Sequence, residues 1–234
     1  MLRNRGKRSS DDKWFADKWH PIFKEAVNDL CYFLSRGYAE RSALQIVGNR
    51  YKLNKRQRKA IYRMSCSDEQ VALRTRSSCN VGSVKHEEVE IDGFNLLILL
   101  ESILSGAYVF KGRDGLFRDI SSVHGSYRRV LKTESAIILV GNALKELEVG
   151  PVKWYFDRPV SNSGRIKTKL LEISDNNGFN WEAELVMNPD KVLVTSSKIV
   201  ITSDGGILDH VGKWFNLGAY LIDNHINHPN IIAV

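Results

Sequence analysis

Residues 88–104 read EVEIDGFNLLILLESIL, and this stretch predicts a strand that leads directly into a helix. Val89 and Ile91 alternate with acidic residues, which is typical of a short strand. The residues from about Phe94 to Leu104 are almost all apolar and predict a buried helix. A strand followed at once by a helix indicates the start of an α/β domain.

The sequence after Leu104 continues this alternation. We predict a hairpin at about 108–120, a helix at about 134–148, a strand at 152–156, a helix at 165–174, a strand at 199–202 and, after one more helix, a closing strand at 219–222. Strands separated by helices of this length need right-handed crossovers. Residues 83–234 are therefore predicted to form an α/β domain, a three-layer α/β/α fold with a mostly parallel sheet.

The residues before this domain predict a small all-α domain at 1–82. Pro21 opens a helix that Gly37 ends, a second helix covers about 39–49, and a third covers about 55–64 with Asn54 as its cap. Ser67 begins a capping box for a fourth short helix. Residues 77–85 are small, polar and without periodicity, so they are predicted to be a linker, with the domain boundary near residue 82.

The charge of the chain is uneven. Residues 1–80 carry 18 Lys and Arg against 8 Asp and Glu, whereas the remainder carries 16 against 19. A domain this basic attracts polyanions, of which nucleic acid is the usual one inside cells, although a solvated charged surface is an equal interpretation. The basic third helix fits a helix-turn-helix layout, in which Arg56, Arg58 and Lys59 would contact nucleic acid. A three-helix module that contacts protein has the same periodicity.

The bulk composition excludes some classes of protein. Hydrophobic residues make up 43% and charged residues 26%, as in a soluble protein. No apolar run reaches the roughly 18 residues of a membrane span, and no apolar segment follows the charged start, so we expect a cytoplasmic protein without a membrane partner. The spacing of three cysteines predicts reduced thiols and no structural metal. The sequence does not indicate an oligomeric state.

Aspartates follow three of the predicted strands. Asp92, Asp157 and Asp204 each come directly after or near a strand end, and Asp209 lies five residues beyond Asp204. The carboxyl ends of parallel strands line one crevice, so these side chains are expected to converge. Carboxylates brought together favour a divalent cation such as Mg²⁺ or Mn²⁺, which can activate water for phosphodiester hydrolysis. Alternatively, Asp157 and Asp204 simply cap the helices that follow them.

Two segments carry a resemblance to known families. The stretches Ile91-Asp92-Gly93-Phe94-Asn95-Leu96 and Thr202-Ser203-Asp204-Gly205-Gly206-Ile207-Leu208-Asp209 resemble the first and last acidic motifs of NYN and PIN nuclease domains. The resemblance covers about residues 86–223 and implies a PIN-like fold. The whole arrangement also looks like an uncharacterised, mainly archaeal family known only by domain-of-unknown-function labels.

This resemblance implies roles for individual residues. The catalytic cluster would be Asp92, Asp157, Asp204 and Asp209, with Asp92, Asp204 and Asp209 as ligands of Mg²⁺ or Mn²⁺. Asn95 would orient water or phosphate. The acidic residue that many PIN domains place on a middle helix has two candidates, Glu101 and Glu134, and Asp157 can substitute for it.

Further polar residues are candidates for substrate contact. Ser161, Ser163 and Arg165 lie in a loop at a helix start, where free amides and hydroxyls can hold a phosphate. A second set of basic residues would neutralise the charge of substrate phosphates, or would simply form a solvated helix face. These residues are Arg113, Arg128, Arg129, Lys167 and Lys169. The segment 113–129, which contains Asp119 and His124, is predicted to lie over the site. Trp154 and Trp181 are expected either to stack on bases or to pack in the core.

The sequence thus predicts a metal-dependent nuclease, with RNA favoured because the resembled nucleases mostly act on it. The alternative is a non-catalytic nucleic-acid-binding adaptor on a degenerate PIN-like scaffold. A toxin of toxin–antitoxin type is a third possibility. A haloacid-dehalogenase-type phosphatase is disfavoured, since that chemistry needs a second acid two residues after the first, and Phe94 stands there.

Overall fold

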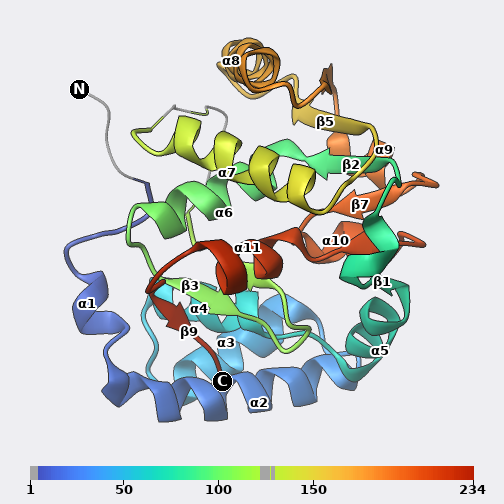
Figure 1. Ribbon diagram of the computed structural model, residues 1–234. Coiled ribbons are helices and arrows are strands. Elements are labelled where there is room, and N and C mark those ends of the chain that lie inside the picture. The colour runs from blue at the N-terminus through green and yellow to red at the C-terminus, as the bar shows by residue number, and fades with distance from the viewer. Residues whose placement is uncertain (1–4, 122–126, 128–129) are drawn as a thin grey trace.

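The computed structural model describes residues 5–121, 127 and 130–234. Within these residues a six-stranded parallel sheet has the order β1-β8-β7-β2-β5-β6 (Figure 1). Its strands are β1 (Ser78–Cys79), β8 (Trp214–Phe215), β7 (Ile199–Ile201), β2 (Val89–Asp92), β5 (Val152–Asp157) and β6 (Trp181–Val186). The predicted α/β fold, with a parallel sheet and a helical N-terminal region, is confirmed.

Helices cover both faces of this sheet. The longer ones, α6 (Gly93–Leu104), α7 (Thr133–Glu146), α8 (Ser163–Asn177) and α11 (Leu217–His225), share one core with Val89 and Ile91 of β2. The short helices α9 (Pro189–Leu193) and α10 (Gly205–Leu208) pack with Tyr155 and Val200 in a separate cluster. Neighbouring residues of a strand point to opposite faces, which explains why Val200 belongs to a different cluster from Ile199 and Ile201.

The passage from β2 to α6 depends on a glycine. Asp92 ends the strand and caps the helix by accepting a hydrogen bond from the Asn95 backbone amide at 3.4 Å. A Cβ atom at Gly93 would collide with the ring of Phe156 on the neighbouring strand β5. The glycine therefore lets the helix begin directly beside the sheet.

The N-terminal region is helical, as predicted. It contains α1 (Asp11–Trp14), the 3-10 helix η1 (Asp17–Trp19), α2 (His20–Ser35), α3 (Glu40–Arg50), α4 (Lys55–Met64) and α5 (Asp68–Ser77). The predicted caps are confirmed: Asn54 accepts hydrogen bonds from the amides of Arg56 and Gln57, and Ser67 accepts one from the amide of Gln70. Such capping boxes depend on neighbouring residues alone, which is why they could be recognised in the sequence.

A second, three-stranded sheet joins the two regions. It consists of β3 (Val109–Lys111), β4 (Phe117–Arg118) and β9 (Ile231–Ile232), and the antiparallel pairing of β3 with β4 confirms the predicted hairpin. Val109 packs with α6 and α11, whereas Phe110 packs with the N-terminal helices. The small sheet therefore has one helical layer on each side, and Figure 1 shows β3 and β9 between α11 and the N-terminal helices.

Three sequence-based assignments differ from the structure. Residues 219–222 lie in α11 rather than in a closing strand, because Asn216 caps a helix by accepting a hydrogen bond from the Ala219 amide; the last strand is β9. Strand β6 was not anticipated. The supposed linker at 77–85 contains β1, which pairs with β8, and the 3-10 helix η2 (Val81–Val84). The boundary near residue 82 stays a prediction.

Two other properties follow from the described residues. The indole rings of Trp154 and Trp181 are buried, with centroids 5.1 Å apart, so both tryptophans pack in the core rather than offering a surface for bases. None of the helices in this part of the chain combines the length and hydropathy that a membrane-spanning segment requires.

The shared core predicts that the helical region and the α/β region unfold together. Phe110 is fully buried between them, so Phe110→Ala should lower the free energy of unfolding by about 3–5 kcal/mol and keep a single transition in urea. Met187→Ala is the control, because Met187 is 68% exposed, and it should stay within about 0.5 kcal/mol of wild type. Two separate transitions, followed by circular dichroism and tryptophan fluorescence, would contradict this prediction.

Candidate functional site

The parallel sheet brings several strand ends to one edge. Strands β7, β2, β5 and β6 are neighbours in that order, and all run in the same direction. Asp92 and Asp157 are the last residues of β2 and β5. Asp204 follows β7, and Asp190 follows β6 at the start of α9. These four side chains are called here the carboxylate cluster. Each is linked to at least one other member by a charge effect on a pKa.

Asp92 is the most buried member, with 7% of its surface exposed. Its Oδ2 accepts a hydrogen bond of 2.8 Å from the Thr202 hydroxyl. Burial raises the pKa of Asp92 to about 7; the hydrogen bond from Thr202 opposes this change, and the negative charge of Asp204 adds to it. A carboxyl group with this pKa can hold or release a proton near neutral pH.

Thr202 also fixes the position of Asp204. The Asp204 amide donates to the Thr202 hydroxyl oxygen at 3.1 Å, so this hydroxyl connects the two aspartates. Asp204 Oδ1 accepts a hydrogen bond of 2.8 Å from the Gly206 amide and caps α10. The alternative that Asp204 caps a helix is thus correct, but capping occupies only one of its oxygens.

Asp190 is a member of the cluster that the sequence reasoning missed. Asp190 lies at an exposed position, but its partial desolvation raises its pKa, and the charge of Asp204 raises the pKa further. Asp157 behaves in the same way, since burial raises its pKa and the charge of Asp190 adds to the effect. Asp190 could have been found if β6 had been recognised, because it follows that strand as Asp204 follows β7.

Asn95 secures the loop that carries Asp204. Its Oδ1 accepts hydrogen bonds from the Ser203 amide at 2.8 Å and from the Ser203 hydroxyl at 2.9 Å. The Ser203 carbonyl in turn accepts a hydrogen bond of 2.7 Å from Arg118 Nε. The side-chain oxygen of Asn95 is therefore used within the protein, and its proposed contact with water or phosphate would fall to its amide nitrogen.

Asp209 lies in a different set of contacts. Its two oxygens accept hydrogen bonds of 2.7 Å from Arg74 Nε and 2.7 Å from Gln70 Nε2, both on α5. Arg74 also pairs with Asp114 at 2.5 Å. Because both oxygens of Asp209 are engaged with α5, the expected role of Asp209 as a metal ligand has no support in this geometry. Its position indicates a structural role, holding α10 to α5.

The basic residues of α4 are directed mainly into the protein. Arg56 forms hydrogen bonds of 2.7 Å to both oxygens of the buried Asp11. Arg58 donates to the Leu53 carbonyl at 2.8 Å and lies against Gly48, where a Cβ atom would collide with its guanidinium. The Lys59 ammonium donates to the Ser121 carbonyl at 3.0 Å, and burial lowers its pKa. The structure thus gives these three side chains internal partners.

The loop after β5 places its polar residues unequally. Ser161 and Arg165 are exposed, whereas Ser163 is buried and its hydroxyl donates to the Arg158 carbonyl at 3.4 Å. Asn162, with a φ of 71°, donates its side-chain amide to the Tyr127 carbonyl at 2.9 Å. A phosphate contact therefore remains open to Ser161 and Arg165 but not to the Ser163 side chain as it stands.

The remaining candidates have separate places. Glu101 is buried on α6, where the hydroxyls of Tyr127 and Thr133 and the guanidinium of Arg5 contact it.

Glu134 pairs with Lys169 at 3.5 Å, and Arg113 pairs with Asp68 at 2.5 Å. Lys167 is half-buried on α8. Asp119 is half-buried near Arg63, and burial raises its pKa. His124, Arg128 and Arg129 lie outside the described residues.

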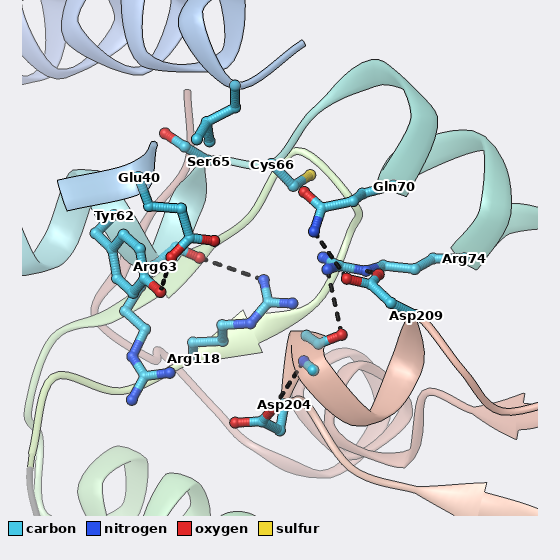
Figure 2. A pocket seen from close by; sticks show the side chains of 13 residues that line it. Glu40, Tyr62, Arg63, Ser65, Cys66, Gln70, Arg74, Arg118, Asp204 and Asp209 are labelled. Carbon is cyan, nitrogen blue, oxygen red and sulfur yellow. Dashed lines mark hydrogen bonds and ion pairs between the residues drawn. The ribbon is translucent and has the colours of Figure 1, made fainter. Parts of the chain in front are cut away.

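A pocket of about 320 Å³ opens beside the carboxylate cluster, between α4 and α10 (Figure 2). Asp204 and Gly205 line it on one side, and Tyr62 and Arg63 line it on the other. The charge of Asp204 contributes to the raised pKa of Tyr62, of which burial is the main cause. The helical region therefore forms one wall of the candidate site. Sequence reasoning did not expect this, because nothing local in α4 shows which surface it faces.

The carboxylate cluster is not a preformed metal cage. Among the described residues, no three His, Cys, Asp or Glu side chains are arranged so that they could hold a metal ion. Several oxygens of the cluster already accept hydrogen bonds, as described for Asp92 and Asp204.

Comparisons with known proteins place the chain in a family. Residues 81–220 match the family described as "Domain of unknown function (DUF5616)", which covers more than half of the chain. The chain belongs to this family. Residues 22–76 match a further family, "Protein of unknown function (DUF434)". An uncharacterised protein of Methanocaldococcus jannaschii is 34% identical over 185 residues, which are 79% of this chain and 88% of that protein.

No solved structure matches the chain. The expected similarity to an uncharacterised archaeal protein of this layout is thus confirmed. Neither family description names an activity, so the resemblance of this DUF5616 member to PIN and NYN nucleases remains a hypothesis.

The raised pKa of Asp92 predicts a pH-dependent stability. The folded-state pKa is about 7 and the ordinary value is 3.8, so the native state keeps a proton that the unfolded state has released. Stability should therefore fall as the pH rises from the ordinary value towards 7. Asp92→Asn carries no charge and should remove this fall, exceeding the stability of wild type at pH 8 by up to about 4 kcal/mol.

The measurement is urea unfolding at pH 5 and pH 8 in the presence of chelator. Asp223→Asn, at an exposed position of α11, is the matched control and should follow wild type at both pH values. An Asp92→Asn variant that is less stable than wild type at pH 8 would show that the Asp92 carboxylate is not destabilised in the folded protein.

The contacts of Asp209 predict that Arg74 is structural. Arg74 is 4% exposed and bridges Asp114 and Asp209, so Arg74→Met leaves a buried carboxylate with fewer partners. We expect a loss of about 3 kcal/mol in the free energy of unfolding. Arg76→Met changes the same charge at an exposed position of the same helix and should stay within about 0.5 kcal/mol of wild type. Equal stability of the two variants in urea would contradict the assignment.

Proposed function

We propose that the chain is a metal-dependent nuclease that hydrolyses phosphodiester bonds in RNA at the carboxylate cluster. The observation that supports it best is the placement of Asp92 and Asp204 at the ends of the neighbouring strands β2 and β7, where the Thr202 hydroxyl contacts both and where burial and the charge of Asp204 raise the pKa of Asp92. Such crowding of like charges is relieved by a proton or by a bound cation. The resemblance of both segments to the acidic motifs of NYN and PIN nucleases favours the cation.

The residues present fit an ion that keeps part of its water. Mg²⁺ is commonly held by one or two carboxylates, with water and substrate phosphate completing its coordination, so three protein ligands are not required. Asp92 and Asp204 would hold the ion, and Asp190 and Asp157 would bind its water molecules. When bound, Mg²⁺ or Mn²⁺ would lower the pKa of a water molecule and neutralise charge on the phosphate.

The surrounding side chains hold these carboxylates in position. Thr202 connects Asp92 with the backbone of Asp204, and Asn95 and Arg118 hold Ser203 from two sides. Groups held by hydrogen bonds lose little freedom when they bind a ligand, so this arrangement supports a site where position matters. In the proposed reaction, either Asp190 or Asp157 would accept one proton from the water molecule that attacks phosphorus. The P–O bond to the neighbouring nucleotide would then break, and the leaving oxygen would take a proton from solvent.

The second candidate is a nucleic-acid-binding adaptor without catalysis. One observation favours it, namely that no three acidic, histidine or cysteine side chains in the described part of the chain are arranged as a metal site. The adaptor would bind RNA equally well with and without a divalent cation.

The test is a cleavage assay with labelled structured RNA and single-stranded DNA, in Mg²⁺, in Mn²⁺ and in chelator. Wild type should cut RNA only when a metal is present, and Asp92→Asn and Asp204→Asn should be at least about 100-fold slower. Asp223→Asn is the control and should cut like wild type.

Each other outcome has a distinct meaning. If the protein binds RNA without cutting it, the nuclease proposal fails and the adaptor is the supported function. Cutting that persists in chelator or in both variants would exclude the carboxylate cluster as the site, and cutting of DNA alone would exclude RNA as the substrate.

A further inference from the structure

The pocket beside the carboxylate cluster contains three arginines with different surroundings. Arg74 and Arg118 are nearly buried, and both pair with Asp114, at 2.5 Å and 2.6 Å. Arg74 also pairs with Asp209, and Arg118 donates to backbone carbonyls of Ser203 and Arg63. The positive charges of these two arginines are thus already compensated within the protein.

Arg63 differs from them. Its Nε is buried, and among the residues that the structure describes it has no hydrogen-bond partner. Its charge lowers the pKa of the nearby Asp119, against the larger effect of burial, but no ion pair joins the two in the described residues. No hydrogen bond or ion pair of the Arg63 guanidinium is found among the described residues, so its terminal nitrogens are open to a ligand in the pocket.

The backbone of Arg63 is held beside the loop that carries Asp204. Its carbonyl accepts a hydrogen bond of 3.2 Å from Arg118, which also holds the Ser203 carbonyl next to Asp204. Arg118 therefore sets the distance between the end of α4 and the loop that carries Asp204. In Figure 2 the Arg63 side chain extends from α4 into the space beside Asp204. A ligand in this pocket would meet a cation on one wall and a carboxylate on the other.

We propose that this pocket binds one nucleotide of a single-stranded nucleic acid, with the Arg63 guanidinium on its phosphate. The inference rests on the proposed function and deepens it, since it names the strandedness of the substrate and a phosphate ligand supplied by the helical region. A guanidinium suits this role because its planar donors match two phosphate oxygens at once.

The size of the pocket supports a single nucleotide. A volume of about 320 Å³ lies at the lower end of small-molecule sites and leaves no room for a double helix. A base within a duplex would have to leave its stack before it could enter, which costs energy that a single strand does not spend.

Tyr62 gives the pocket an aromatic wall. Its hydroxyl donates to Glu40 Oε2 at 2.9 Å, which holds the ring in place, and the residue is 39% exposed. Exposed aromatic rings beside a cationic group are typical of sites that bind single strands by stacking and phosphate contact. The aromatic wall and the cation come from consecutive residues of α4, so one helix supplies both.

The experiment measures binding rather than cleavage. A fluorescently labelled single-stranded RNA octamer is titrated with the full chain in Ca²⁺, with a gel to verify that it stays intact, at several salt concentrations. Arg63→Ala should weaken binding about tenfold and lower the slope of log affinity against log salt by about 0.7, the loss of one phosphate contact. A blunt RNA duplex of eight base pairs should bind more weakly to wild type.

Arg41→Ala is the matched control. Arg41 is exposed on α3 of the same helical region, so this change removes the same charge but no pocket group, and the salt slope should stay that of wild type. Arg63→Lys tests the contact if the alanine variant does not fold, and it should keep the salt slope but bind more weakly than wild type. Melting curves of all variants verify the fold.

The outcomes separate this inference from the proposed function. If Arg63→Ala loses affinity as expected while wild type cuts nothing, the pocket is a binding site and the nuclease proposal fails. If wild type cuts RNA but Arg63→Ala binds like Arg41→Ala, the nuclease stands and the pocket proposal is overturned. Absence of single-stranded binding by wild type, or equal binding of the duplex, also overturns it.

Discussion

The buried ion network around Asp114 is the constraint on which the candidate site depends. Asp114 lies in the β3–β4 turn and pairs with Arg74 of α5 and with Arg118 of β4. These arginines then reach Asp209 and the Ser203 carbonyl. Ion pairs that leave water gain little net stability, but separating the partners leaves a buried charge without compensation, so the pairs resist rearrangement. The network thus fixes the helical region, the small sheet and the Asp204 loop relative to one another.

The two segments that match separate families share a hydrophobic core in the folded protein. The DUF434 match ends at residue 76 and the DUF5616 match begins at residue 81, so β1 lies between them. The core of the helical region nevertheless includes Phe110, Ile120 and Ile232, which come from the far side of that division. The matched segments are therefore not independent cores, and the helical region cannot keep its packing without the small sheet. This packing is also what brings α4 to the edge of the parallel sheet.

Local signals explain what could be predicted from the sequence. The caps at Asn54 and Ser67 depend on residues three positions apart, and the strand β2 and helix α6 show their periods within one short stretch. Strand β6 was missed although its sequence, WEAELV, alternates apolar and acidic residues as β2 does, and Asp190 was missed with it. The strand predicted at 219–222 was wrong, because Asn216, which lies just before this range, caps a helix there.

The site was harder to predict than the fold, because its chemistry depends on partners far apart in the sequence. Asp92 and Thr202 are 110 residues apart, and Asp209 and Arg74 are 135 apart. Parallel strand order explains why the first pair could be expected to converge. No comparable rule indicated that Asp209 would form an ion pair with Arg74, or that Arg56 would form one with Asp11.

The distribution of charge narrows what kind of nucleic-acid binding the molecule can support. A long basic surface neutralises many phosphates and binds duplexes tightly, with a strong dependence on salt. Here Arg56 and Arg74 are paired with aspartates inside the protein, and Arg58 lies against its own helical region. Their charges add to the net charge of the chain without adding phosphate contacts. If nucleic acid is the ligand, these three side chains are not among its phosphate contacts, whereas Arg63 of α4 lines the pocket between α4 and α10 and is placed to make one.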